Sequence, residues 1–540
     1  MGRPTRLAAA LAVLLAPSAV LASPEEPAPA KDSIPAKDSI PAKDPAPAKP
    51  AGPRVLRMTI REAVATALKN NLDLQASSFG PPVAEANLRS AEALYDHLFT
   101  AQMSGGQRRA PVASKFQGDG TEISEDTFSA SIGVSRLLPT GGTLGVSTGV
   151  IRTHTNSDLY QINPYWESDL SLNYRQPLLR GAGRDVTEAS LRYSRDSRDF
   201  ADLDLRSRTE DLVRLVEATY WSLVQARQDV ASQLKSVDVA EDLLRISEAR
   251  LSAGAGTKVD VSQAAAGVAL RRVDLLRAEN TLRSFEENLL GFLMPRTPDS
   301  PSGGDLRFEP ADDPETSLPP LPVEDTDTAV VRALVDRADI RSQKVLVDQA
   351  QVAVIVAESD AKPSLNLEAR AGYSGVDGYS ETSYSHSMAQ REWPSWSVGL
   401  FLEVPIGNRA AKARLEGARL SRSRAEAEVR ASESRAAVRV RNARREIEST
   451  RQQIDAARLA TRLSEEQLQA EKERLKNDKS TTFEVLRLES DLTDARRSEI
   501  RALVDYLQAS IRYEYELGSI LESRGILPPG AKDGKAGKGP

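Results

Sequence analysis

The segment RLSAGAGTKVDV, residues Arg250 to Val261, recurs in altered form as RLKNDKSTTFEV, residues Arg474 to Val485. Before the two copies, residues 185–252 and 408–476 contain no proline, and apolar residues recur there at helical spacing among many charges. At about 1.5 Å per residue, each stretch predicts a helix about 100 Å long. Such a helix is too long for an ordinary globular core, so it has to pack lengthwise in a coiled coil or a barrel. The recurring segments are then tight breaks before shorter returning helices.

Other features recur in the same order in the two halves of the chain. The segment RQPLLRG places Pro177 at the end of one predicted strand arm, and EVPIGN places Pro405 at the end of another, an offset of 228 residues. Nearer the start of each half, Ala67 and Ala333 sit in matching amphipathic helices with an offset of 266. The fall from 266 to 228 puts 38 extra residues into the first half, before Pro177. The sequence therefore predicts two structural repeats per chain, each with a helix, a strand arm, a very long helix and a returning helix.

Two helix starts carry the sequence of a capping box, in which the first side chain and a carboxylate three residues later satisfy each other's backbone amides. Thr59 with Glu62 opens the first helix, and Asp185 with Glu188 precedes the first very long helix. We expect both helices to begin at these residues.

The strand arms alternate between apolar and polar side chains, the period of a strand with one apolar face. Residues 364–374 and 396–404 show this pattern over about the nine to eleven residues that a tilted membrane-spanning strand requires. In the first half, a strand through 170–174 follows a predicted hairpin of 128–134 and 144–150 with a turn at 139–142.

Aromatic residues gather in the same arms. Three of the four tryptophans lie there together with several tyrosines, where interfacial girdles of membrane barrels place such side chains; we single out Trp166, Tyr373, Trp393 and Trp396. A soluble sheet with one buried face also fits the alternation, but the aromatic placement favours lipid. Four to six strands are too few to close a barrel, and open edges do not occur in lipid, so subunits have to share one barrel.

The remaining segments are assigned by composition. Residues 1–22 combine Arg3 and Arg6, an apolar run and small residues, which predicts a secretory signal peptide rather than a membrane anchor. The expected organisation is a signal peptide (1–22), a Pro/Ala/Lys-rich linker (23–57), the first repeat (58–296), a second linker (297–325), the second repeat (326–523) and a disordered tail (524–540).

Several function classes find no support in the sequence. The net charge of −6 mixes 71 basic with 77 acidic residues, so no basic face for nucleic acid stands out. The absence of cysteine excludes disulfides, thiolate metal sites, a cysteine nucleophile and an N-terminal lipid anchor. The three histidines, His97, His154 and His386, are far apart in sequence, which disfavours a metal site or a catalytic base. The glycines around Gly254 lack the lysine of a phosphate loop, so we expect neither an enzyme nor a cofactor.

Taken together, the duplication, the junctions LNYRQPLLRG and LFLEVPIGNR, and the two break segments resemble the TolC-type outer membrane efflux protein family. The resemblance covers about residues 58–521. Two departures stand out. The extra hairpin gives this chain more strands than the usual four, and Asp478 occupies a position where the family usually has glycine.

The resemblance implies a mainly α fold with β structure: a homotrimer whose strand arms form one β-barrel in the outer membrane of a Gram-negative bacterium, continued through the periplasm by a long antiparallel α-helical barrel. It implies a channel that passively conducts substrates in a tripartite efflux or type I secretion system. The partners would be a periplasmic adaptor (membrane fusion) protein, an inner-membrane pump and outer-membrane lipid. No cofactor and no metal is implied.

The resemblance also assigns roles to residues at the two breaks. The breaks would be periplasmic tips that contact the adaptor through Arg250, Leu251, Gly254, Arg474 and Leu475. The narrow aperture of the channel would be lined by the acids Glu484 and, through the repeat, Asp260, with Arg487 able to pair with Glu484 and hold the aperture shut.

Two other classes of exported protein remain as alternatives. A periplasmic adaptor would have one helical hairpin framed by small soluble β-domains, whereas this chain has two hairpins preceded by amphipathic strands. A coiled-coil scaffold of the envelope would not need alternating strands with aromatic ends, and it would fractionate outside the membrane.

Overall fold

The computed structural model describes residues 54–112, 122–157, 159–254, 257–294, 306–386, 393–476, 479–480 and 482–526. All of these belong to one compact unit, residues 53–540. The expected signal peptide and all but the last residues of the expected first linker lie outside the described residues.

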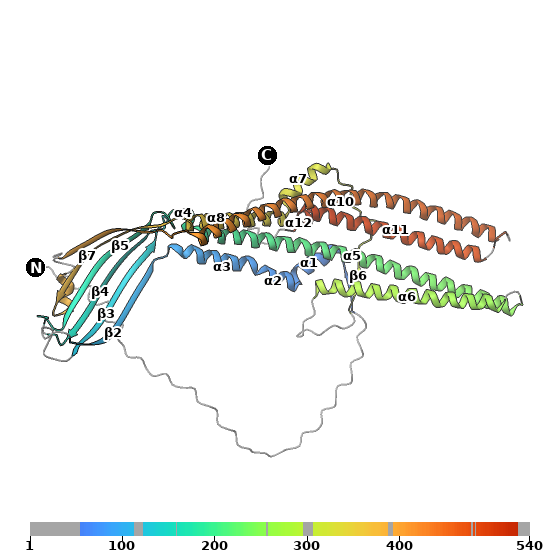
Figure 1. Ribbon diagram of the computed structural model, residues 1–540. Coiled ribbons are helices and arrows are strands. Elements are labelled where there is room, and N and C mark those ends of the chain that lie inside the picture. The colour runs from blue at the N-terminus through green and yellow to red at the C-terminus, as the bar shows by residue number, and fades with distance from the viewer. Residues whose placement is uncertain are drawn as a thin grey trace, which may run out of the picture. The chain divides into compact units, whose positions relative to one another are not determined.

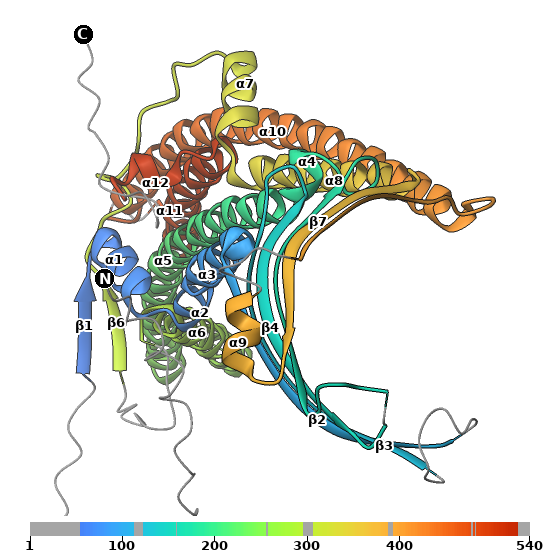
Figure 2. The ribbon, with the colours of Figure 1, turned by 90° about the vertical axis from the view of Figure 1, so that its left-hand side faces the viewer.

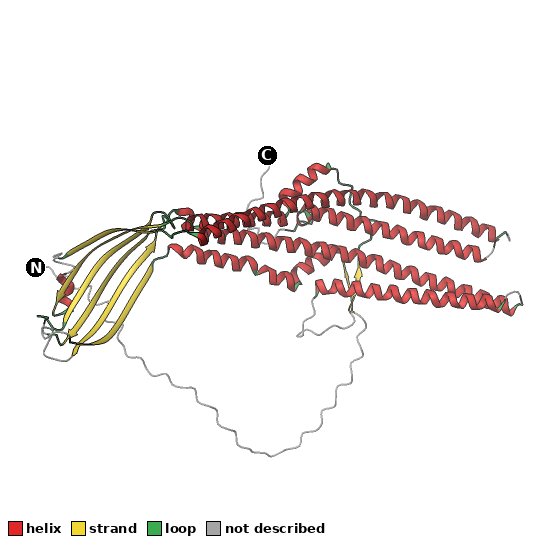
Figure 3. Ribbon diagram, viewed as in Figure 1, coloured by secondary structure: helices red, strands yellow, loops and turns green. Residues whose placement is uncertain are grey.

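Six strands form one antiparallel sheet in the order β2-β3-β4-β5-β7-β8 (Figures 1 and 3). They are β2 (Leu98–Pro111), β3 (Glu122–Leu137), β4 (Thr143–Thr155), β5 (Tyr165–Pro177), β7 (Ser364–Asp377) and β8 (Pro394–Glu403). The five strands predicted from alternation are all present. The turn expected at 139–142 joins β3 to β4, and Gly141 in it has a φ of 87°, a conformation that glycine adopts readily.

Strand β2 was not expected from the sequence. Its residues LFTAQMSGGQRRAP lose the apolar alternation after Met103, where two glycines and several polar residues follow. It nevertheless pairs with β3 over its whole length, from Leu98 opposite Ser135 to Pro111 opposite Glu122. The sheet therefore has six strands.

Four long helices form two antiparallel pairs. Helix α5 (Ala189–Ser252) packs along α6 (Lys258–Leu293), and α10 (Arg409–Lys476) packs along α11 (Thr482–Leu517). The two very long helices end within the two recurring segments, as predicted. No helix in the described parts of the chain combines the length and the apolar character needed to cross a membrane.

Shorter helices surround these pairs. The set comprises α1 (Ile60–Asn70), α2 (Leu72–Ser78), α3 (Gly80–Glu92), the 3-10 turn η1 (Ala93–Tyr95), α4 (Arg184–Thr187), α7 (Thr326–Asp336), α8 (Ala338–Asp360), α9 (Ser380–Ser385) and α12 (Ile520–Ser523). Helix α8 packs against both α5 and α10 and thereby connects the two pairs (Figure 2).

The two expected capping boxes have different outcomes. Thr59 and Glu62 form the reciprocal pair at the start of α1, as predicted. The second prediction was wrong: the short helix α4 intervenes, and α5 starts after Glu188 without a side-chain cap. The Glu188 carboxylate instead accepts hydrogen bonds from the Tyr95 hydroxyl at 3.0 Å and from Arg184 Nε, four residues before it, at 2.9 Å.

The structure describes parts of the segments expected as linkers and as the tail. Strand β1 (Arg54–Met58) lies in the first linker and β6 (Leu306–Pro310) in the second, and the two pair in parallel because their apolar side chains share the core. Phe308 in β6 is buried. In the tail, the guanidinium of Arg524 makes two hydrogen bonds to the Glu217 carboxylate, at 2.7 and 2.9 Å.

Two hydrophobic clusters hold the helices together. One joins α1, α5, α6, α11 and α12 around Tyr220, whose hydroxyl donates to Asp312 Oδ2 at 2.8 Å. The other joins α7, α10 and α11 around Tyr506, whose hydroxyl donates to the Pro319 carbonyl at 2.8 Å. Because α11 contributes to both clusters, it ties the two helical pairs into one packed body.

Candidate functional site

One face of the six-stranded sheet is apolar along most of its width. A row of cross-strand partners on this face runs through Phe99, Val134, Val146, Leu172, Ala371 and Trp396. The next row, two residues farther from the helices, consists of Ala101, Ile132, Thr148, Leu170, Tyr373 and Pro394. Successive side chains of a strand point to opposite faces, so the two rows lie on the same face. Large apolar side chains on this face are exposed, which is unfavourable in water.

The opposite face is polar. The row between the two apolar rows consists of Thr100, Gly133, Ser147, Ser171, Gly372 and Ser395. On the same face, Arg175 Nε lies 3.5 Å from Glu368 Oε1, and Arg370 Nη2 lies 3.6 Å from Asp169 Oδ2. A hollow on this face is lined by residues from every strand of the sheet. The sheet can therefore separate an apolar medium from an aqueous one.

The four girdle residues lie in the half of the sheet that is farther from the helices. Tyr373 pairs with Pro394, next to Trp393, whose carbonyl accepts from the Ser374 amide at 3.3 Å. Trp166 pairs with Asp377 at the end of β7. Trp396 is 80% exposed. The structure thus brings them to one end of the strands.

Helix α9, which the sequence did not reveal, packs on the apolar face near this end and contacts β4, β5 and β7. Its Ser383 is fully buried, with Oγ 2.9 Å from Ser168 Oγ and 2.9 Å from the Gly375 carbonyl that accepts from it. The Tyr384 hydroxyl lies 3.2 Å from Thr148 Oγ1. Helix α9 therefore covers part of the apolar face with polar side chains, at the end of the strands that is farther from the long helices.

At the first break, Gly254 has a φ of 72°, which favours glycine, and it follows the C-terminus of α5 directly. Leu251 lies in the last turn of that helix. Arg250 is in the same turn, but its side chain lies outside the described part of the structure, as does residue Gly256.

At the second break, Arg474 Nη1 lies 3.2 Å from Glu471 Oε2, and its side chain is exposed. The Ser480 hydroxyl and Arg474 hold the pKa of Glu471 below its usual value. Leu475 belongs to α10, but its side chain and residue Asp478 lie outside the described residues.

The acids expected at the aperture each lie in the first turn of a returning helix, Asp260 in α6 and Glu484 in α11. Glu484 Oε1 lies 2.8 Å from Arg487 Nη2 in the same helix, which is the pair expected from the sequence. The side chain of Asp260 lies outside the described part of the structure.

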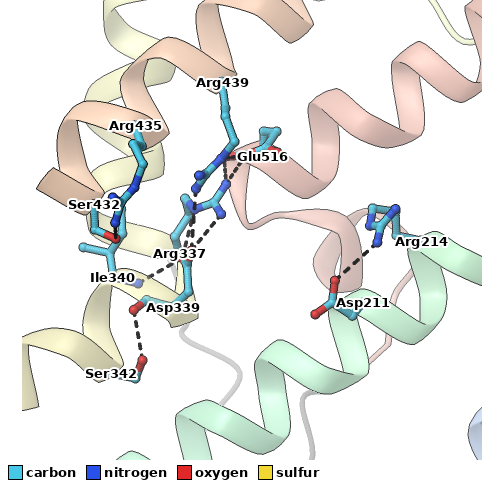
Figure 4. Close-up of polar contacts among 10 residues, drawn as sticks. All are labelled: Asp211, Arg214, Arg337, Asp339, Ile340, Ser342, Ser432, Arg435, Arg439 and Glu516. Atoms are coloured by element: carbon cyan, nitrogen blue, oxygen red, sulfur yellow. Dashed lines mark hydrogen bonds and ion pairs between the residues drawn. The ribbon is translucent and has the colours of Figure 1, made fainter. Parts of the chain in front are cut away.

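A buried ion network that the sequence did not reveal joins α8, α10 and α11 (Figure 4). The guanidinium of Arg337, 5% exposed, donates to both carboxylate oxygens of Asp339 at 2.9 Å and to the Glu516 carbonyl at 3.0 Å, and it also pairs with the Glu516 carboxylate. Arg439 Nε donates to Glu516 Oε2 at 2.9 Å. Burial alone would lower the pKa of Arg337, but these carboxylates raise it above its usual value.

A second group of ion pairs fastens the C-terminal helix α12 to α5. Arg206 donates to Glu210 at 2.8 Å and to Glu522 at 2.7 Å. Glu210 is buried, and burial raises its pKa to about 7 although Arg206 opposes the shift. Arg524 bridges Glu217 and Glu514 in the same region.

Two of the histidines each have one polar contact. His154 Nδ1 is 3.0 Å from Asn163 Oδ1, and His386 Nδ1 is 3.5 Å from Asp377 Oδ2. Among the residues that the structure describes, no group of three or more His, Cys, Asp or Glu side chains is arranged to hold a metal ion.

With this geometry established, comparison with known proteins decides the family. The sequence profile described as "Outer membrane efflux protein" matches residues 143–293 and 329–518, which is more than half of the chain. The chain belongs to the outer membrane efflux protein family. The resemblance to TolC-type proteins is therefore confirmed, and the family is one of outer-membrane channels for efflux rather than of enzymes.

Solved structures of outer-membrane channels share the fold of this efflux-family chain. The outer-membrane channel OprN has a TM-score of 0.63 at 17% identity, covering 85% of this chain and 90% of its own. CmeC of Campylobacter jejuni has a TM-score of 0.62 at 17% identity, with coverages of 85% and 86%. MtrE of Neisseria gonorrhoeae has a TM-score of 0.55 at 18% identity, with coverages of 86% and 89%. No curated protein sequence matches this chain.

Proposed function

We propose that this chain is the outer-membrane channel subunit of a tripartite efflux or type I secretion system. It conducts, without chemistry of its own, substrates that an inner-membrane pump delivers through a periplasmic adaptor. The observation that carries the proposal is the two-faced sheet: an exposed apolar face and a polar, hollowed face on strands joined to helices about 100 Å long. Such a sheet suits lipid on one side and water on the other.

The channel is a homotrimer in this proposal. The sheet ends at β2 on one side and at β8 on the other, and six strands do not close around a lumen. An open edge leaves backbone amides and carbonyls unpaired in the hydrocarbon layer, where each unpaired group costs several kcal/mol. Closure between subunits in a symmetric ring removes these edges. The long helices then continue the barrel into the periplasm.

The chain is organised as two repeats in this proposal, 58–296 and 326–523, preceded by a signal peptide in 1–22. Support comes from the matched lengths of the helices: α6 and α11 have 36 residues each, and α5 and α10 have 64 and 68. The segments 23–57 and 297–325 are the linkers in this proposal, and the paired strands β1 and β6 lie at the end of the first and within the second.

The two helix breaks meet the adaptor in this proposal, through Arg250, Leu251 and Gly254 at the first and Arg474 and Leu475 at the second. Support comes from the left-handed backbone of Gly254 and the exposed side chain of Arg474. A partner's helical hairpin can dock between two such tips.

Asp260, Glu484 and Arg487 line the aperture in the trimer, and the girdle residues Trp166, Tyr373, Trp393 and Trp396 face the membrane interface. The contact of Arg487 with Glu484 supports a partly neutralised acidic ring. Carboxylates crowded around a narrow mouth attract polyvalent cations.

The experiment that tests this function is a pull-down of the tagged native protein from isolated outer membranes after brief in-cell cross-linking. We expect an adaptor and an inner-membrane pump to co-purify, and the identity of the pump narrows the substrate class. Recovery of the protein from the soluble periplasm, without a pump, would overturn the proposal and favour a soluble adaptor or a coiled-coil scaffold.

A further inference from the structure

The two edge strands of the sheet have apolar side chains that are more exposed than those of the inner strands. On the apolar face, Met103 of β2 is 68% exposed and Leu400 of β8 is 65% exposed. Val146, on the inner strand β4 of the same face, is 48% exposed. Among the described residues, β2 and β8 each pair with one strand, whereas every inner strand of the sheet pairs with two.

The two edges match each other in direction. Strand β2 begins at Leu98, directly after the helical segment η1, and runs away from the helices. Strand β8 runs the opposite way and ends at Glu403, just before α10 begins at Arg409. If β2 and β8 are placed side by side with the ends that adjoin the helices at the same level, they run antiparallel. All neighbouring strands within the sheet are also antiparallel.

The faces also match, but only in alternate registers. Odd-numbered residues of β2 and even-numbered residues of β8 lie on the apolar face, since Phe99 and Trp396 belong to the same cross-strand row. Placing Leu98 opposite Glu403 sets Phe99 opposite Leu402 and continues both faces across the seam. A slip of one residue moves every side chain of one strand to the wrong face.

We propose that β2 of one subunit pairs with β8 of the next copy of this chain in that register, with Ala101 opposite Leu400 and Met103 opposite Val398. The inference rests on the trimer proposed above. Three sheets of six strands then close a barrel of 18 strands. The seam is built by the β2–β3 hairpin, which precedes residue 143, where the family match begins. This hairpin thus both widens the barrel and forms the contact between subunits.

A competing closure uses β4 instead of β2. Strand β4 also runs away from the helices, and Val146 on its apolar face would stand opposite Leu400 if Thr143 were level with Glu403. In the structure, however, β3 already pairs with β4 from Thr143 to Thr155. The two closures differ in which strand meets β8, so a cross-link distinguishes them.

Cysteine pairs test the seam, because the chain has no cysteine of its own. The variant carrying Ala101→Cys and Leu400→Cys is expected to give disulfide-linked dimers and trimers on denaturing gels after mild oxidation. The matched control carries Val146→Cys and Leu400→Cys and is expected to give none. Two register controls combine Ala101→Cys with Val398→Cys or with Leu402→Cys. We expect their cross-link to be lost, because diagonal neighbours lie about 7–8 Å apart, beyond the roughly 7 Å that a disulfide spans.

The outcomes separate the seam from the trimer itself. Native mass measurement before oxidation establishes whether each variant is trimeric, and a short bifunctional thiol reagent replaces the disulfide where its geometry is strained. Trimers that cross-link through position 146, or through neither 101 nor 146, overturn the β2–β8 seam while leaving the channel function intact. A stronger cross-link in a register control overturns the register. A monomer in every variant overturns the proposed function.

Discussion

Removal of the Arg337 guanidinium is expected to loosen the contact between the end of α11 and the start of α8. Arg337 is buried and satisfies two carboxylates, those of Asp339 and Glu516. The variant Arg337→Met has a side chain of similar length without a charge. In the described part of the chain, the only cation left near the two carboxylates is then the guanidinium of Arg439, 2.9 Å from the Glu516 carboxylate and 3.7 Å from the Asp339 carboxylate. Breaking a buried ion pair costs about 3–5 kcal/mol. Because Arg439 compensates in part, we expect a value near the lower limit.

Hydrogen–deuterium exchange measures this loss locally, in the intact protein in detergent. A cost of about 3 kcal/mol corresponds to roughly a hundredfold faster exchange in peptides that cover the end of α11 and the start of α8. Peptides near Glu484, at the opposite end of α11, are expected to be unchanged. The matched control is Arg341→Met, an exposed position on α8. Equal exchange in Arg337→Met and wild type, or an equal effect in the control, refutes the reasoning.

Three further predictions concern charge. The folded protein holds the Glu210 proton more tightly than the unfolded chain, because burial raises the pKa of Glu210 from 4.5 to about 7. The free energy of unfolding therefore falls by about 3 kcal/mol as the pH rises from about 4.5 to above 7. In denaturant titrations, Glu210→Gln should flatten this part of the pH–stability profile, and a flat wild-type profile contradicts the prediction. Charge reversal at Arg250 and Arg474 should abolish adaptor cross-linking while trimers persist, and unchanged cross-linking counts against the tip assignment. The variant Asp260→Asn with Glu484→Gln should weaken block of single-channel current by a trivalent cation on the periplasmic side, and equally strong block shows that these acids do not line the aperture.

Features with a regular period were predictable from the sequence. The lengths of α5 and α10 follow from their helical periodicity and their ends from the two recurring segments, and the strands with apolar alternation follow from their period of two. Strand β2 was missed because its second part, from Ser104 onward, has no alternation of apolar and polar side chains. There, pairing with β3 rather than side-chain pattern determines the strand.

Features that depend on residues far apart in the chain were not predictable. Arg337, Arg439 and Glu516 come from three separate segments, and nothing in their local sequence indicates that they meet. The predicted cap at Asp185 failed because Asp185 lies inside the short helix α4, and Glu188 pairs with Arg184 and with Tyr95, 93 residues away. The tip and aperture residues came from a family resemblance, and their roles stay predictions.

The central claim is that this chain forms a closed trimeric channel in the outer membrane. Native mass spectrometry of the protein extracted from the outer-membrane fraction tests it most directly, because detergent-stable barrels keep their subunits together. We expect a mass of three mature chains. A folded single chain, recovered from the same extract or from the soluble fraction, would contradict it.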